Sequence, residues 1–250
     1  MINLVVFCRQ GLMSTINLSL FALSLADFSS LLLQLWMVLT SLIPYVNIPV
    51  VYQDLLHLTG GIPHGTFCRL SCSITVYITA ERCLCVVFPM KITQLITLKR
   101  AATIIVCISM TTLLASVPIY FSHYLEWNFY PNFNRTLLGS VITSLNRAIV
   151  KVLYFANAIS GVIAIAAVAI FTSILIWTLK EKSAWRRSAN IQQQKSEALS
   201  NRDRSTLNMV VFIAVVLLIC YTPSVILSVV TFFEPEFNSG RRYVLIYELC

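Results

Sequence analysis

The stretch AATIIVCISMTTLLASVPIYFS, residues 101–122, decides the fold of this chain. It contains no Asp, Glu, Lys or Arg. A helix needs about 20 mainly apolar residues to cross the ~30 Å hydrocarbon core of a bilayer. Because unpaired backbone polar groups cost several kcal/mol in lipid, a spanning segment must be a helix or part of a closed barrel. Barrel strands are about half as long and alternate polar with apolar residues. The stretch therefore predicts a transmembrane helix.

The whole chain has the composition of a membrane protein. Of its 250 residues, 58% are hydrophobic and only 11% are charged, and the mean hydropathy is +0.80. So few charges cannot cover the surface of a soluble globule of this size. We therefore expect a multi-pass protein of the plasma membrane, with lipid as one of its partners.

The distribution of the charges divides the chain into spans. We expect an all-α integral membrane protein, a seven-transmembrane helix bundle that is incomplete at both ends and forms one domain over residues 1–250. The apolar run at residues 1–8 is too short to cross and is not a cleavable signal, and the apolar run at residues 241–250 is also too short. Most of the first and of the seventh helix is therefore expected to be missing. The polar segment 181–203 is either a helix extension or a mobile loop. The expected helices cover residues 1–8 in part, 12–40, 54–87, 99–122, 147–180 and 203–233 in full, and 241–250 in part.

The basic residues predict the orientation. Most of the 18 Lys and Arg residues fall in loops on the side of Arg9 and Arg82, which places that side in the cytosol. The net charge of +8 is then explained by membrane topology and by attraction to the anionic inner leaflet. Nucleic acid is therefore not expected as a partner. Asn134, in the triplet Asn134-Arg135-Thr136, falls outside and is a candidate for N-glycosylation. A second triplet begins at Asn17, inside an expected helix that would prevent its use.

Enzymatic function is not predicted. No nucleophile with a neighbouring base and no set of metal ligands stands out, so neither an enzyme nor an organic cofactor is expected. A secondary transporter would show internal repeats and broken helices, for which Gly60-Gly61 with Pro63 is the one hint. None of the eight cysteines lies in an expected outer loop, which argues against a disulfide framework.

Three segments resemble a known family. NLSLFALSLAD (17–27), AERCLCVVFPMK (80–91) and FIAVVLLICYTPS (212–224) resemble the second-, third- and sixth-helix signatures of rhodopsin-like, class A G-protein-coupled receptors. ITAERCLC (78–85) is similar to chemosensory receptors of molluscs. The resemblance implies a receptor that binds an extracellular chemical or peptide ligand and activates a heterotrimeric G protein. A non-signalling receptor fragment and, less favoured, a transporter are the alternatives.

The chain departs from that family at several positions. Cys83 replaces the usual aromatic residue after the Arg, and Tyr221 replaces the usual Trp two residues before Pro223. The family's outer disulfide is also expected to be absent, because His57 stands at the position of the third-helix cysteine.

Asp27 is a charge in the middle of an expected membrane helix. An ionised side chain there costs at least ~2.5–3.5 kcal/mol, so Asp27 must face the bundle interior. The resemblance implies that it binds a sodium ion together with Ser71, with Asn3 nearby. A structural Asp that is protonated or bound to water is the alternative.

The candidate ligand pocket contains His64, Cys68, Arg69 and Tyr221. His64 lies about five helical turns above Arg82 and on the same face, in the outer half where ligands of the resembled family bind. Arg69 lies ~20 Å above Arg82 and could meet an anionic ligand. Alternatively, Arg69 binds neighbouring carbonyls and hydroxyls, and His64 is a structural residue.

The candidate switch lies at the inner end of the bundle. Asp203, ~30 Å below Pro223, reaches the depth of Arg82 and can bond its guanidinium across helices, while Glu81 steadies Arg82 from the same helix. Asp203 could instead be a solvated residue at a helix start. Pro223 lacks an N–H and is expected to kink the sixth helix, next to Tyr221.

The loop after the third helix is the candidate G-protein contact. Phe88, Pro89 and Met90 follow Arg82 as an apolar knob among basic residues, which suits docking on a cytosolic protein. A lipid-facing or structural turn is the alternative.

Overall fold

The computed structural model describes most of the first three quarters of the chain. It covers residues 14–40, 49–88, 96–130, 134–141 and 144–188, and the separate positions 7, 9, 211–212, 215–216, 219–220, 222–223 and 225–226. The expected partial helix at residues 241–250, and Asn3, Pro89, Met90, Asp203 and Tyr221, lie outside the described residues.

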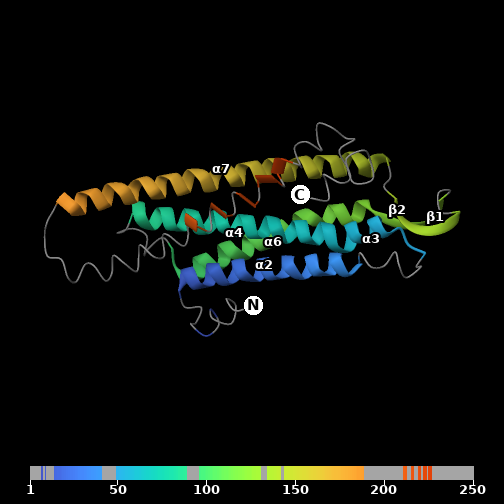
Figure 1. Cartoon of the computed structure of the whole chain (residues 1–250), viewed down its shortest axis with the longest axis horizontal. Helices are drawn as coiled ribbons and strands as arrows, with labels where there is room; N and C mark the ends of the chain where they lie inside the picture. Colours follow the sequence, from blue (N-terminus) through green and yellow to red (C-terminus); the bar gives the residue numbers. More distant parts are fainter. Residues whose placement is uncertain are drawn as a thin grey trace.

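Long helices run side by side along one axis (Figure 1). Each covers an apolar run predicted from sequence, and four of the described helices are long and apolar enough to cross a membrane. In chain order the elements are α2 (Thr15–Thr40), α3 (Tyr52–Leu56), the π-helix η2 (His57–Gly61), α4 (Ile62–Val87), α6 (Leu98–Ser122), β1 (Tyr124–Tyr130), β2 (Arg135–Val141) and α7 (Ser144–Ser188).

Helix α4 is the centre of the bundle. It packs against α2, α6 and α7, and its buried residues occupy several faces. The core between α2 and α4 packs aliphatic side chains against one another, and within lipid this packing stabilises the helix pair through van der Waals contacts. This core contains Leu20, Leu23 and Ala26 of α2 and Leu70, Ile74 and Ile78 of α4.

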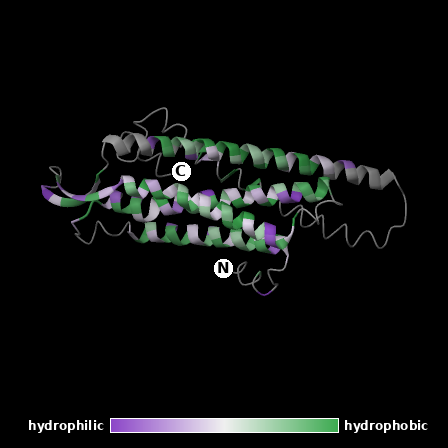
Figure 2. Ribbon diagram, turned by 180° about the vertical axis from the view of Figure 1, so that it is seen from behind, coloured by the Kyte–Doolittle hydropathy of each residue, from purple (hydrophilic) through white to green (hydrophobic). Residues whose placement is uncertain are grey.

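The outward faces of the helices are also apolar. Hydrophobic residues extend along much of each long helix (Figure 2). Leu31 of α2, Phe121 of α6 and Trp177 of α7 are more than half exposed. Exposed apolar surface on every side of a bundle is the pattern that lipid, rather than water, covers.

The third predicted span has a local π-helical turn. The chain is helical from Tyr52 to Val87, but residues 57–61 adopt π geometry before α4 begins. Pro63 lacks the N–H that would bond to the preceding turn, and π-bulges arise where the regular pattern is interrupted. Gly60 is buried against α2, and a Cβ there would collide with Met37. The helix therefore stays continuous through Gly60-Gly61, which weakens the one hint of a transporter-type broken helix.

A β hairpin closes the α3 end of the bundle, and it was not predicted. Strands β1 and β2 pair antiparallel, from Tyr124 with Val141 to Tyr130 with Arg135. Asn134 lies at the turn with a φ of +48°, in the left-handed region that Asn tolerates better than most residues. We refer to this end of the bundle as the hairpin end and to the opposite one as the Arg82 end.

The hairpin is fastened to the bundle by hydrogen bonds. The Ser140 N–H donates to the Asp54 carboxylate at 2.7 Å. The Leu138 N–H donates to the Pro49 carbonyl at 3.0 Å, and the Val51 N–H donates to the Leu138 carbonyl at 2.9 Å. Together these hydrogen bonds join β2 to Asp54 and to the segment Pro49–Val51.

Helix α7 is longer than predicted. It has 45 residues and is therefore about 68 Å long, twice the hydrocarbon thickness. The part from Lys151 to Thr178 has the composition of a span. Of the two alternatives for the segment after 180, the helix extension holds as far as Ser188. The described positions between 211 and 226 are all helical, within the range expected for the sixth helix.

Candidate functional site

The polar side chains selected from sequence gather along the contact between α2 and α4. The two helices are antiparallel neighbours, so residues early in α2 meet residues late in α4. We refer to this line of contacts as the polar seam. From the Arg82 end to the hairpin end it comprises Ser19, Asp27 and Ser30 on α2, and Glu81, Ser71, Cys68 and His64 on α4.

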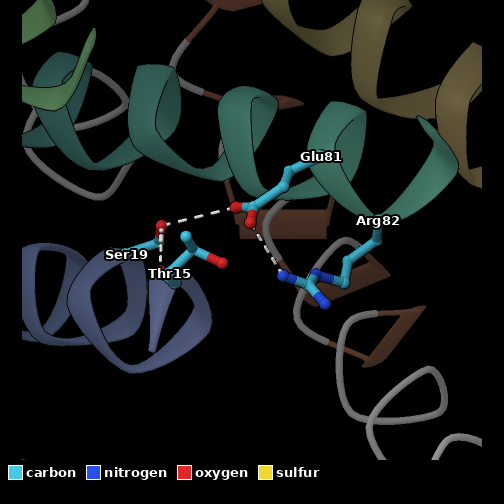
Figure 3. A network of polar contacts seen from close by, with 4 residues as sticks. All are labelled: Thr15, Ser19, Glu81 and Arg82. Carbon is cyan, nitrogen blue, oxygen red and sulfur yellow. Dashed lines mark hydrogen bonds and ion pairs between the residues drawn. The ribbon is translucent and has the colours of Figure 1, made fainter. Parts of the chain in front are cut away.

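At the Arg82 end, Glu81 and Arg82 form an ion pair inside the bundle (Figure 3). Arg82 Nη2 donates to Glu81 Oε1 at 3.0 Å, and the two side chains are only 10% and 1% exposed. Ser19 of α2 faces the same carboxylate, with its Oγ 3.5 Å from Glu81 Oε2. Because the single Ser19 hydroxyl proton also reaches the Thr15 carbonyl at 2.8 Å, the link across to Glu81 is the weaker of the two.

Two polar atoms near this ion pair are buried without a partner among the described residues. They are Arg82 Nε and Tyr77 Oη. A buried donor left unpaired costs about 1–3 kcal/mol, so such groups usually have a partner in another state or element. The Arg82 guanidinium thus retains a donor for a further acceptor.

In the middle of the seam, Asp27 meets Ser71. The Ser71 hydroxyl donates to Asp27 Oδ1 at 2.5 Å, a short hydrogen bond of the kind that a charged acceptor makes. Asp27 therefore points toward α4, although its side chain remains exposed within the described part of the chain. Two oxygen donors lie together here, and oxygen is the ligand type that hard cations prefer.

Toward the hairpin end, Ser30, His64 and Cys68 form a closed polar cluster. His64 Nδ1 lies 3.0 Å from Ser30 Oγ and 3.2 Å from the Ser30 carbonyl oxygen. Cys68 Sγ lies 3.6 Å from His64 Nε2 and 3.4 Å from Ser30 Oγ. All three side chains are half-buried.

Arg69 makes a hydrogen bond within its own helix. Its Nη2 donates to Thr66 Oγ1 of its own helix at 3.1 Å. Thr66 is buried, so the hydroxyl that it offers lies inside the bundle. This contact fits the alternative in which Arg69 binds a neighbouring hydroxyl rather than a ligand.

The remaining candidates lie apart from the seam. Phe88, at the end of α4, is 53% exposed, and Pro223 is helical and exposed. The Arg82–Asp203 link and the pocket role of Tyr221 fall on residues outside the described part of the chain. They therefore stay predictions.

Ser19 and Ser30 were not singled out from the sequence. Each contributes the α2 side of a contact with a predicted α4 residue. Their spacing of 11 residues follows three helical turns, which would have revealed a shared face once the register of α2 on α4 was known.

The whole chain matches one protein family. The family model for the serpentine type 7TM GPCR chemoreceptor Srw matches residues 1–249. The chain belongs to the Srw serpentine chemoreceptors. No curated protein matches it.

Membership in Srw confirms several predictions. The Srw chain is an all-α membrane helix bundle and a multi-pass protein of the plasma membrane. It belongs to a chemoreceptor family and not to an enzyme family. The match confirms the prediction of a chemoreceptor of the G-protein-coupled-receptor type. It does not test the finer predictions, that the chain is a rhodopsin-like receptor and that it is similar to molluscan receptors.

Proposed function

We propose that this Srw chemoreceptor binds an extracellular small molecule or peptide in the outer half of the bundle and activates a heterotrimeric G protein at the inner end, by a rhodopsin-like mechanism. The observation that carries the proposal is the placement of two polar sites on α4. The Ser30–His64–Cys68 cluster touches one end of this helix and the buried Glu81–Arg82 pair occupies the other. A single packed helix can transmit a shift between them.

The outer site supports ligand recognition by its chemistry. A pocket needs a few polar groups that converge among apolar residues. His64 Nε2 and Cys68 Sγ lie within hydrogen-bond distance of each other, and both side chains are only half-buried. Arg69 and Tyr221 stay members of the proposed pocket.

The inner site supports a switch. Arg82 is held by Glu81 and still has one buried N–H group without a partner in the described part of the chain. Asp203 is the proposed acceptor for that group in the resting receptor. Outward movement of the sixth helix, hinged at Pro223, would break the link and release Arg82 for the G protein, next to Phe88, Pro89 and Met90.

Asp27 and Ser71 stay the proposed sodium ligands. Their oxygens meet at one point of the seam, between the outer and inner sites. A cation there would neutralise the Asp27 charge and tie α2 to α4, which favours one packing of the two helices over another.

Guanine-nucleotide exchange on co-expressed G proteins tests the proposal. Cells carrying the receptor at a measured surface level are exposed to pooled small molecules and short peptides. We expect exchange with the unmodified receptor and none with Arg82→Ala, while Lys151→Ala, an exposed control at the hairpin end of α7, keeps the response. A receptor that reaches the surface and gives no exchange with any G protein, with or without the pools, would identify a non-signalling fragment.

A further inference from the structure

The Ser30–His64–Cys68 cluster favours one tautomer of the histidine. His64 Nδ1 lies 3.0 Å from the Ser30 hydroxyl, which can accept or donate, and 3.2 Å from the Ser30 carbonyl, which can only accept. A proton on Nδ1 suits both contacts, whereas a proton on Nε2 would leave the Nδ1 lone pair facing the carbonyl oxygen. In a neutral imidazole the other nitrogen then carries a lone pair. That nitrogen, Nε2, is the atom that faces Cys68 Sγ at 3.6 Å.

This arrangement is a thiol beside a base, with a third group that orients the base. Nucleophilic cysteines are activated by a histidine that accepts the thiol proton, and the histidine is itself held by a hydrogen bond on its other nitrogen. Here Cys68 supplies the thiol, His64 the base and Ser30 the orienting carbonyl. The Ser30 hydroxyl, 3.4 Å from Sγ, can donate to the sulfur as negative charge develops.

The other cysteines of the described spans lack this environment. Cys72, one turn further along α4, is buried with 2% exposure, and eight residues of helix separate it from His64, about 12 Å. Cys83 is also buried. Cys85, at the Arg82 end of α4, is half-buried, but 21 residues of helix, about 32 Å, separate it from His64. Cys107 and Cys220 are exposed and lie on helices other than α4. Accessibility and a neighbouring base coincide at Cys68.

A metal ion fits the cluster less well. Transition metals in proteins take three or four strong donors, and no group of three His, Cys, Asp or Glu side chains gathers in the described ranges. Two soft donors, one of them able to take a proton from the other, suit an organic electrophile better.

We propose that Cys68 is the attachment point for soft electrophilic chemicals, such as α,β-unsaturated carbonyl compounds, and that His64 activates its thiol. The inference rests on the proposed function for the outer site and names its ligand class. In the reaction, His64 Nε2 takes the thiol proton, and Cys68 Sγ bonds to the β-carbon of the electrophile. The carbon–carbon π bond opens, its electrons pass into the enolate, and the enolate takes the proton back from His64. The product is a thioether, and no oxidant or reductant is needed.

N-ethylmaleimide, an unsaturated imide, is the probe. The full chain is placed in phospholipid nanodiscs, treated for increasing times and digested, and the alkylation of each cysteine is followed by mass spectrometry. We expect Cys68 to react about tenfold faster than free N-acetylcysteine in the same buffer at neutral pH, because a base-assisted thiol reacts as a thiolate. Equal rates for the two thiols would overturn the proposal.

His64→Gln isolates the base. A glutamine amide can still donate to the Ser30 carbonyl but cannot accept a proton, so the rate at Cys68 should fall to that of free N-acetylcysteine or below. Continued protection of the buried Cys72 and Cys83 reports that the variant is folded, and Cys72→Ser, the matched control, should leave the rate at Cys68 unchanged. An undiminished rate at Cys68 in folded His64→Gln contradicts the role of the histidine.

Acidification gives a second reading on the unmodified receptor. An unassisted thiol loses about tenfold in rate per pH unit as its thiolate fraction falls. From about pH 8 to about pH 7, the alkylation rate of Cys68 should fall less than that of N-acetylcysteine, because neutral His64 still serves as base. Parallel losses would overturn the proposal even if His64→Gln did not fold.

The labelling needs no G protein, so the two proposals can fail separately. Fast, His64-dependent alkylation in a receptor that activates no G protein supports the reactive thiol and rejects the signalling function. A receptor that signals while Cys68 reacts no faster than free N-acetylcysteine keeps the signalling function and rejects the reactive thiol.

Discussion

Ser71 of α4 donates a 2.5 Å hydrogen bond to the carboxylate of Asp27 on α2. The two residues are far apart in the chain, and the contact is the one that a cation between the helices would have to reorganise. Because hydrogen bonds to charged groups contribute about 1.5–3 kcal/mol, this contact is a substantial part of the polar attraction between α2 and α4.

Asp27→Asn should abolish the sodium dependence of agonist affinity. The substitution keeps the shape and the contact with Ser71 but removes the negative charge that attracts the cation. Agonist affinity is measured in membranes with sodium or with an organic cation at equal ionic strength. Ser71→Ala should weaken the sodium effect, whereas Ser73→Ala, whose hydroxyl bonds to the Arg69 carbonyl of its own helix, should not. Full sodium dependence in Asp27→Asn would reject the ion site.

Asp203→Ala should raise ligand-free signalling. If the Arg82–Asp203 link favours the resting state by ~1.5–3 kcal/mol, its loss raises the active population roughly 10- to 150-fold. Arg82→Ala should instead lose coupling. Basal nucleotide exchange is compared at matched surface levels, and wild-type basal activity in Asp203→Ala would show that Asp203 is a solvated residue.

Glu81→Ala should destabilise the receptor more than the double substitution of Glu81 and Arg82 by alanine does. It leaves the Arg82 charge buried and uncompensated, which costs about 3–5 kcal/mol. Adding Arg82→Ala removes that stranded charge, so the double variant should recover part of the loss. Thermal unfolding of the purified proteins gives the comparison, and strictly additive losses would show that the pair is not coupled.

His64→Ala should weaken agonist potency by ~1.5–3 kcal/mol while surface expression is kept, because it removes a polar contact from the proposed pocket. Arg69→Ala should have the same effect only if Arg69 leaves Thr66 to meet ligand. Ser173→Ala serves as the control, since its hydroxyl bonds within α7. Lost expression with normal potency in the remaining receptors would make both residues structural.

Asn134→Gln should remove the shift in gel mobility that a glycosidase produces in the receptor made in eukaryotic cells. Asn134 is exposed at the hairpin turn, where an oligosaccharide has room. Asn17→Gln should leave the shift unchanged, because Asn17 lies within α2. A glycosidase-sensitive shift that persists in Asn134→Gln would place the sugar elsewhere.

The sequence predicted the features that depend on local composition. A run such as residues 101–122 must be a membrane helix whatever it packs against, and α6 spans Leu98–Ser122. The Asp27–Ser71 contact was also anticipated, through the family resemblance. What it would bind is untested.

Features that depend on the register between helices were not predicted. The contact between Ser30 and His64 depends on the axial register of α2 relative to α4, and hydropathy carries no information on that register. The hairpin was missed for a related reason. Its strands pair with each other and with the segment Pro49–Val51, so their structure is set by partners distant in the chain.

The way in which the hairpin is attached to the bundle bears on the conditions under which the protein can be expressed. Asp54, Pro49 and Val51 hold β2 through hydrogen bonds, and residues 123–147 contain no cysteine. Formation of this cap therefore needs no oxidising compartment and no disulfide isomerase. Cell-free synthesis in the presence of a reductant suits this receptor, and the same reductant would keep the Cys68 thiol ready for its electrophile.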